Sequence, residues 1–206
     1  MQYEACVNLE KPERVLAFEK YRNGISSSKI HIERDAHKEL NQEMRKKKMT
    51  KYQSLPALSF YDIPNYGWWS RSNRSQYAHT ILCINVIRFN CSWMLDEFQK
   101  ISSEFSEYIW INEPETLIYS GGVTTTDTRS SSMEYDIKKG DFVSIVECAN
   151  NDALKKHLGN VQDADLFQNR LSQAGVKMKI IHKMMYRTSG IGFMDRGKRN
   201  AFSTRL

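Results

Sequence analysis

The chain has 206 residues and a mass of 24.1 kDa, which allows one compact domain with extensions or two very small domains. Apolar residues make up 40% of it, while a mean hydropathy of −0.59 indicates a largely polar remainder. The formal net charge of +6 favours an acidic partner such as a nucleic acid, an anionic membrane surface or an acidic protein. No segment approaches the roughly 18 apolar residues of a membrane-spanning helix, so no membrane span is expected.

The cysteine pattern gives no metal site and no disulfide framework. Cys6, Cys83, Cys91 and Cys148 form no Cys-x-x-Cys pair, and no two histidines stand at a metal-binding spacing. Reduced, partly buried thiols in a reducing compartment are expected. The first residues include an acidic side chain and lack an apolar stretch, which is unlike a secretory signal or a transit peptide. A cytoplasmic location is therefore expected.

Residues 1–76 are predicted to form an extended and helical basic arm. A charged helix is expected over 33–51, with sparse apolar positions and a run of three lysines. The segment 55–69 is rich in proline and aromatic residues and has neither a helical nor a strand period. It is expected to lie extended in a groove, either on the chain's own domain or on a partner.

A domain is predicted over residues 77–188. Alternating residues indicate a first strand at 78–89, and apolar residues at three- and four-residue spacing indicate a helix after it. The other expected elements are a strand from Pro114, a polar hairpin loop over 121–140, a strand at 141–148, a helix from 151 that breaks at Gly159 and resumes over 163–173, and a strand at 176–187.

The last predicted strand has two different faces. Val176, Met178, Ile180, His182 and Met184 form an apolar face with one histidine in it, and the opposite face is largely basic. Two helices would cover one side of the four-stranded sheet and leave the other side open. An aromatic arm of the same chain is one way to cover that open side.

Residues 189–206 are predicted to be a basic C-terminal tail. They contain glycine, arginine and lysine with two isolated phenylalanines, and no periodicity runs through them. A segment of this composition cannot bury enough apolar surface to offset the entropy of ordering it, so alone it is expected to be disordered. Contacts with other parts of the chain or with a partner would be needed to hold it.

The stretch from Trp110 to Leu171 carries several motifs in a fixed order. An Asn-Glu-Pro-Glu-Thr-Leu turn at 112–117 leads into a strand, a later strand ends in Ile-Val-Glu at 145–147, and an Ala-Leu-Lys-Lys-His helix follows at 153–157. In this order the chain resembles the antibiotic-biosynthesis-monooxygenase (ABM-like) family. The resemblance implies an α+β fold of the ferredoxin-like βαββαβ type, as in dimeric α/β barrels, here with long N-terminal and C-terminal extensions. It also implies a homodimer through the open sheet face.

The resemblance also implies a place for chemistry. ABM-like enzymes bind an aromatic, quinone-like or haem ligand in the cleft between the sheet and the helices, and typically need no metal or flavin cofactor. The candidate catalytic residues are Asn85, to hold an anionic oxygen, and Tyr119 and His157, to move a proton. His182 is expected to be a hydrogen-bonded core or interface histidine. Haem degradation is doubtful, because the third strand has no tryptophan and no histidine follows Phe167 at the family's position.

The leading hypothesis is a non-enzymatic structural subunit of a large protein assembly. The predicted arms form a large share of the chain, and the family's catalytic positions are incompletely matched. Acidic tubulin would suit basic arms, which points to the cytoskeleton and to the axoneme of a cilium, with a doublet microtubule as the assembly. The predicted partner-binding residues are Lys46, Lys47, Lys48, Trp68, Trp69, Arg71, Arg74, Arg196, Lys198 and Arg199.

Three alternatives stay open. The first is a cofactor-independent monooxygenase or isomerase acting on a small aromatic or carbonyl compound, for which Asn85, Tyr119 and His157 should converge on a pocket. The second is a subunit of a mitochondrial ribosome or a respiratory complex, located in the mitochondrion. The third is nucleic-acid binding, with arginines on phosphates and tryptophans available for base stacking.

Overall fold

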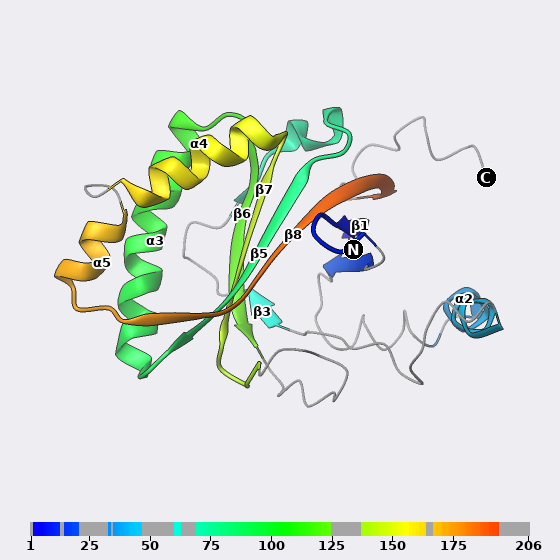
Figure 1. Ribbon diagram of the computed structural model, residues 1–206, viewed down its shortest axis with the longest axis horizontal. Coiled ribbons are helices and arrows are strands. Elements are labelled where there is room, and N and C mark those ends of the chain that lie inside the picture. Colours follow the sequence, from blue (N-terminus) through cyan, green and yellow to red (C-terminus); the bar gives the residue numbers. More distant parts are fainter. Residues whose placement is uncertain are drawn as a thin grey trace.

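The protein is an α+β fold built on one curled antiparallel sheet, with α3, α4 and α5 together on one side and α2 apart from them on the other (Figure 1). The computed structural model describes residues 2–12, 15–20, 33, 35–46, 60–62, 69–124, 137–163 and 167–193. The strand order is β2-β1-β8-β5-β7-β6-β3, and β4 also pairs with β6. The strands are β1 (Gln2–Asn8), β2 (Val15–Lys20), β3 (Phe60–Asp62), β4 (Trp69–Ser70), β5 (Ile81–Phe89), β6 (Thr116–Thr124), β7 (Phe142–Cys148) and β8 (Met178–Phe193).

The α-helices lie close to their predicted positions, whereas the 3₁₀ helix was not predicted. The helices are α2 (Asp35–Lys46), the 3₁₀ helix η1 (Ser72–Gln76), α3 (Ser92–Asn112), α4 (Asn151–Gln162) and α5 (Asn169–Gln173). The predicted break at Gly159 is wrong, since α4 runs through it. One glycine in a helix costs only about 1 kcal/mol relative to alanine, which the buried face of α4 outweighs. No helix in the described ranges is long and apolar enough to span a bilayer.

The larger core lies between the helices and the sheet. Phe98, Ile101, Phe105 and Ile109 recur on α3 at three- and four-residue spacing, and all four are buried against the sheet. Aromatic rings dominate this core: Phe105 stacks on Phe167 with ring centroids 4.9 Å apart. These contacts fix the helical layer over the sheet.

A smaller core lies on the opposite side of the sheet. Cys6 of β1 and the half-buried Leu16 of β2 pack there against apolar residues of the central strands, Leu82, Ile84, Ile118, Val143, Ile145 and Tyr186. Figure 1 places β1 on the side away from α3 and α4. The first 76 residues thus supply strands β1 to β4 of the same sheet, and their pairing covers part of the side that a second copy was expected to close.

Strand β8 is longer than predicted and extends into the expected tail. Its residues up to Phe193 pair with β1, with Cys6 opposite Thr188 and Tyr3 opposite Phe193. Contacts within the chain therefore order residues 189–193, because β1 supplies the backbone partners that this segment alone lacks. Arg196, Lys198 and Arg199 lie outside the described residues, as do Lys47, Lys48, Trp68 and the loop over 125–136.

A β-bulge changes the faces of β8. Ile180 lies opposite Ile87 of β5, but His182 lies opposite Val86, so β8 has one extra residue at this point. Beyond it, Lys183 and Met185 lie opposite Asn85 and Cys83. The predicted alternation is thus wrong past Ile180: Lys183 shares the helix-facing side, and His182 points to the other side.

A buried ion pair joins the N-terminal part of the chain to the centre of the sheet. Arg74 of η1 donates from Nε to Glu147 of β7, and the Thr80 hydroxyl donates to the other carboxylate oxygen. Thr80 also hydrogen-bonds Thr188 of β8 at 2.9 Å. Arg74 is 8% exposed and Glu147 fully buried, so the structure gives this predicted partner-binding arginine an internal partner.

Breaking this pair should destabilise the fold strongly. Arg74→Met leaves the Glu147 charge buried without its partner, and we expect urea unfolding to show a loss of about 3–5 kcal/mol. Arg170→Met is the matched control, because its ion pair with Glu104 is at the surface and such pairs contribute about 0–1 kcal/mol. Equal losses for the two variants would contradict the assigned role of Arg74.

Candidate functional site

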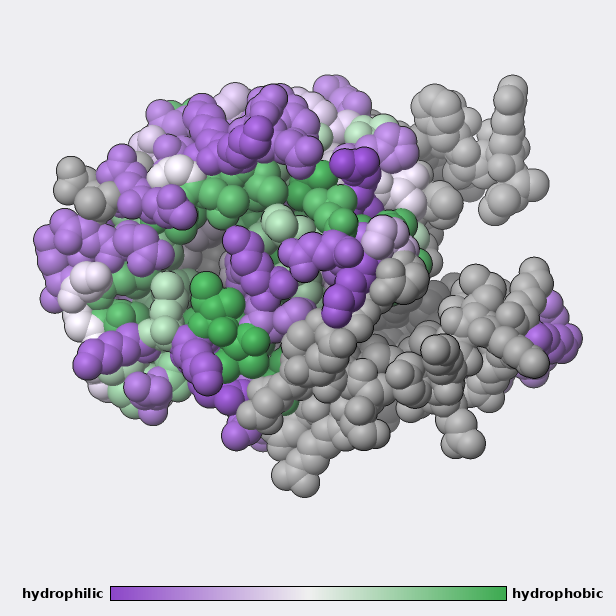
Figure 2. All heavy atoms as spheres, viewed as in Figure 1, coloured by the Kyte–Doolittle hydropathy of each residue, from purple (hydrophilic) through white to green (hydrophobic). Residues whose placement is uncertain are grey.

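The helix-facing side of the sheet has one polar patch. Asn85 of β5 lies between Ser144 of β7 and Lys183 of β8, and residues directly opposite each other in a sheet share a face. Asn85 and Ser144 are half-buried and Lys183 is exposed, unlike the closed core around them. Figure 2 shows an apolar band below α4 that ends in a hollow beside α3 and α5. Because Lys183 is exposed, the patch opens to the outside.

Asn85 is held beside a buried thiol. Its Nδ2 donates to Sγ of Cys83 at 3.8 Å. Burial raises the pKa of the Cys83 thiol, while the Lys183 charge and the Asn85 hydrogen bond act in the opposite direction. Cys83 is therefore a neutral part of the floor. The amide of Asn85, the hydroxyl of Ser144 and the ammonium of Lys183 can each donate to an anionic oxygen, and Lys183 also brings a positive charge.

The phenol of Tyr119 lies deep in the larger core. Its Oη and the Ser102 hydroxyl are 2.8 Å apart. Burial raises the pKa of Tyr119 well above its usual value, and the hydrogen bond from Ser102 only partly offsets this. The Tyr119 and His157 ring centroids are 6.3 Å apart. The phenol therefore keeps its proton at neutral pH.

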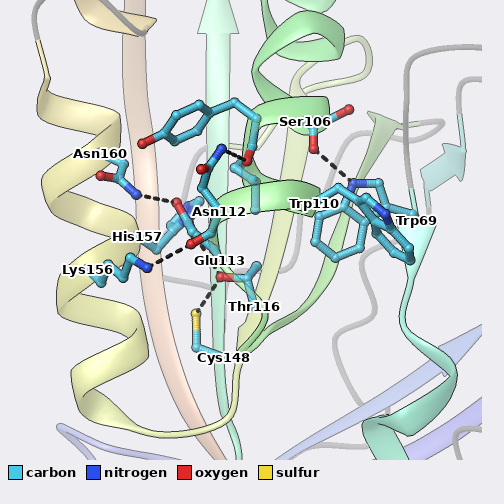
Figure 3. Close-up of polar contacts among 12 residues, drawn as sticks. Trp69, Ser106, Trp110, Asn112, Glu113, Thr116, Cys148, Lys156, His157 and Asn160 are labelled. Carbon is cyan, nitrogen blue, oxygen red and sulfur yellow. Dashed lines mark hydrogen bonds and ion pairs between the residues drawn. The ribbon is translucent and has the colours of Figure 1, made fainter.

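His157 belongs to a buried hydrogen-bond network at the turn before β6 (Figure 3). Its Nδ1 lies 2.9 Å from Glu113 Oε2, an oxygen that also accepts from Thr116. Asn160 Nδ2 donates to Glu113 Oε1 at 2.7 Å. Burial raises the pKa of Glu113, but the hydrogen bonds and the charge of His157 outweigh it, with help from Asn160 and Thr116, so the pKa is lowered. This carboxylate ties α4 to the end of α3.

The structure brings two of the three predicted catalytic residues together. Tyr119 and His157 lie side by side, whereas Asn85 is two strands away across β7, about 10 Å at the usual strand spacing. Lys183 was missed as a site residue because strict alternation put it on the basic face. A single-residue bulge leaves no signal in hydropathy, so only the register reveals this lysine.

The aromatic and basic residues predicted to bind a partner have internal contacts where they are described. Arg71 donates to the backbone carbonyls of Thr116, Trp110 and Glu113, which closes the end of α3, and its guanidinium lies 4.2 Å from the Trp110 ring centroid. Trp69 Nε1 donates to the Ser106 carbonyl at 3.2 Å. Lys46 is exposed and pairs with Glu43 on α2.

A second opening lies at the end of the same sheet face. His79, Ile81, Asn150, Asn151 and Arg187 line a cleft of about 360 Å³. Arg187 of β8 lies opposite Ile81 of β5, so it shares the face of Met185 and Lys183. No cluster of three His, Cys, Asp or Glu side chains suited to a metal ion is found among the described residues.

Comparison with known proteins finds solved structures of similar fold. No family model and no curated protein matches the sequence. A crystal structure named "putative monooxygenase" from Lactobacillus acidophilus NCFM is similar with a TM-score of 0.63 and 11% identity, over 94% of this chain and 79% of that chain. A second crystal structure named "putative monooxygenase", from Fusobacterium nucleatum subsp. nucleatum ATCC 25586, is similar with a TM-score of 0.52 and 13% identity, over 95% of this chain and 76% of that chain. At such identities the likeness shows the fold, which is consistent with an ABM-like fold.

These comparisons correct the leading hypothesis. Both neighbours carry the name of an enzyme, and each matches more than nine-tenths of this chain, whereas the scaffold hypothesis treated the terminal regions as additions to the fold. The prediction of a non-enzymatic structural subunit is therefore wrong. The cytoskeletal, ciliary and microtubule setting depended on it and has no support, and neither has a mitochondrial location.

The Glu113 network should make stability depend on pH. A lowered folded pKa means that the carboxylate stabilises the protein above the ordinary value of 4.5, and that this contribution is lost as the pH falls through the folded pKa. We expect Glu113→Gln to lower the free energy of unfolding by about 1–3 kcal/mol at pH 7, and the difference to shrink in acid. Glu115→Gln, in the same turn but exposed, is the control. A wild-type advantage that stays constant down to pH 3 would contradict the network.

Proposed function

We propose that the chain is a cofactor-independent monooxygenase or isomerase that acts on a small aromatic or carbonyl compound, and that β5-α3-β6-β7-α4-α5-β8 is its ferredoxin-like, ABM-type catalytic unit. The observation that carries the proposal is the pair Asn85 and Lys183, which lie opposite each other on the helix-facing side, with Asn85 half-buried and Lys183 exposed. Two donors for one oxygen, next to the apolar core residues Cys83 and Met185, suit an anion more than a packing role.

The two donors would act by stabilising the substrate's anion. An acidic phenol or an enolisable ketone loses its proton to solvent, and its oxygen accepts from Asn85 Nδ2 and the Lys183 ammonium. The positive charge of Lys183 next to this oxygen lowers the pKa of the bound compound, so its anion accumulates at neutral pH. Tyr119 and His157 would keep the far wall in place through Ser102 and Glu113.

The enolate then supplies all the electrons that dioxygen needs. For an aromatic ketone such as anthrone, the ring CH₂ becomes a carbonyl, one oxygen atom of O₂ enters the quinone and the other leaves as water. The substrate loses four electrons and O₂ takes up four, so no external reductant enters the balance. If the anion is instead protonated at another carbon, the outcome is isomerisation without oxygen consumption.

Oxygen uptake with anthrone tests the proposal. Wild-type protein is expected to accelerate uptake over heat-denatured protein, and Asn85→Ala and Lys183→Met are each expected to reduce this acceleration at least about tenfold, the size of one lost oxyanion donor. Lys179→Met is the matched control, an exposed lysine of β8 opposite Arg88 on the other face. Unchanged rates in both site variants would contradict the proposal. An isomerase would instead catalyse tautomerisation without oxygen uptake, which is measured by the exchange of the substrate's protons.

A further inference from the structure

Lys183, Met185 and Arg187 follow one another on the helix-facing side of β8, from the Asn85 patch to the cleft at Arg187. We call the strip that they form the α4–β8 groove. The half-buried Leu158 and Val161 of α4 and Met185 of β8 belong to the larger core and lie at its surface. In Figure 2 the apolar band below α4 is bordered by hydrophilic side chains on both sides.

Two cations stand at the two ends of this groove. Lys183 and Arg187 are four residues apart on one face of a strand, about 13 Å at the usual rise per residue. Both are exposed, and in the described part of the chain neither has a carboxylate within ion-pair distance, although Arg88 and Arg74 nearby do. Met185 between them has a flexible side chain that adapts to a flat ligand.

The groups at the Arg187 end of the groove suit a second anionic group of the ligand. The cleft there also has His79, whose Nδ1 lies 3.3 Å from the Thr188 carbonyl oxygen. Asn151 begins α4, and Asn150 caps it by accepting from the Ala153 amide at 2.9 Å. The amide end of this twelve-residue helix adds to the Arg187 charge, and the exposed Asp152 of its first turn opposes it. Carboxylates form two parallel hydrogen bonds with guanidinium groups.

We infer that the substrate class is a flat aromatic carboxylate that also carries a phenol or enol oxygen. Its carboxylate binds Arg187, its rings lie on Met185, Leu158 and the edge of Ile81, and its second oxygen reaches Asn85 and Lys183. The identity of the reacting oxygen rests on the proposed function, whereas the carboxylate contact does not. A compound of two fused rings, with the carboxylate at one end and the hydroxyl at the other, matches the distance between Lys183 and Arg187 once both side chains bend toward each other.

Fluorescence titration with 6-hydroxy-2-naphthoate tests the inference, because this probe reports binding without turnover. We expect saturable binding by wild-type protein and a Kd at least about tenfold higher for Arg187→Gln. Arg187→Lys should have an intermediate Kd, because lysine keeps the charge but cannot form the two parallel hydrogen bonds of a guanidinium group. 2-Naphthol, which lacks the carboxylate, should bind with the same Kd to wild type and to Arg187→Gln. Arg187 is exposed, so these variants should unfold at the wild-type urea concentration.

The result that would overturn this inference differs from the result that would overturn the proposed function. No saturable binding up to about 1 mM, or the same Kd for the naphthoate in wild type and Arg187→Gln, removes the carboxylate site. Catalysed oxygen uptake with anthrone, which has no carboxylate, would still stand in that case. Conversely, Arg187-dependent binding supports the substrate class even if anthrone is not oxidised. Lys179→Met should leave both titrations unchanged.

Discussion

The fold depends on strand β8, which pairs with two different strands. β8 pairs with β5 along its first half and with β1 along its second half, so it carries the sheet from the helix-covered centre to the N-terminal strands. Its bulge opposite Val86 and Ile87 sets which side chains face the helices. Without that extra residue Lys183 would face the other side and His182 would take a place on the helix-facing side. The candidate site thus follows from a single register shift.

Buried polar groups hold the two layers on either side of this sheet. Arg74, Thr80, Glu147 and Thr188 connect η1, β5, β7 and β8 on one side, and Glu113, Thr116, His157 and Asn160 connect the α3–β6 turn to α4 on the other. Each network satisfies a buried carboxylate, whose solitary burial would be costly. The half-open strip along β8 lies between these two networks, and it is where we propose that the substrate binds.

The sequence predicted the elements of the central unit well, because their periodicities are local. The helix stripe through Phe98 and Phe105 and the alternation in β5 are found as expected. It could not predict that residues of the first 76 would pair as strands, since β1 mixes Glu4 and Asn8 with apolar residues and owes its form to β8. For the site, the sequence proposed Asn85, Tyr119 and His157 for one pocket, and the structure places Tyr119 beside His157 with Asn85 two strands away. Lys183 and the internal partners of Arg71 and Arg74 depend on contacts distant in sequence.

The central claim is that the ligand site lies between α4 and β8, with Asn85 and Lys183 at one end. The most direct test is the crystal structure of the protein with 6-hydroxy-2-naphthoate bound. The account predicts the rings against Met185, the hydroxyl oxygen within hydrogen-bond distance of Asn85 Nδ2 or Lys183 Nζ, and the carboxylate on Arg187. A probe bound on the opposite side of the sheet, among Leu82, Ile84 and Tyr186, would contradict the account.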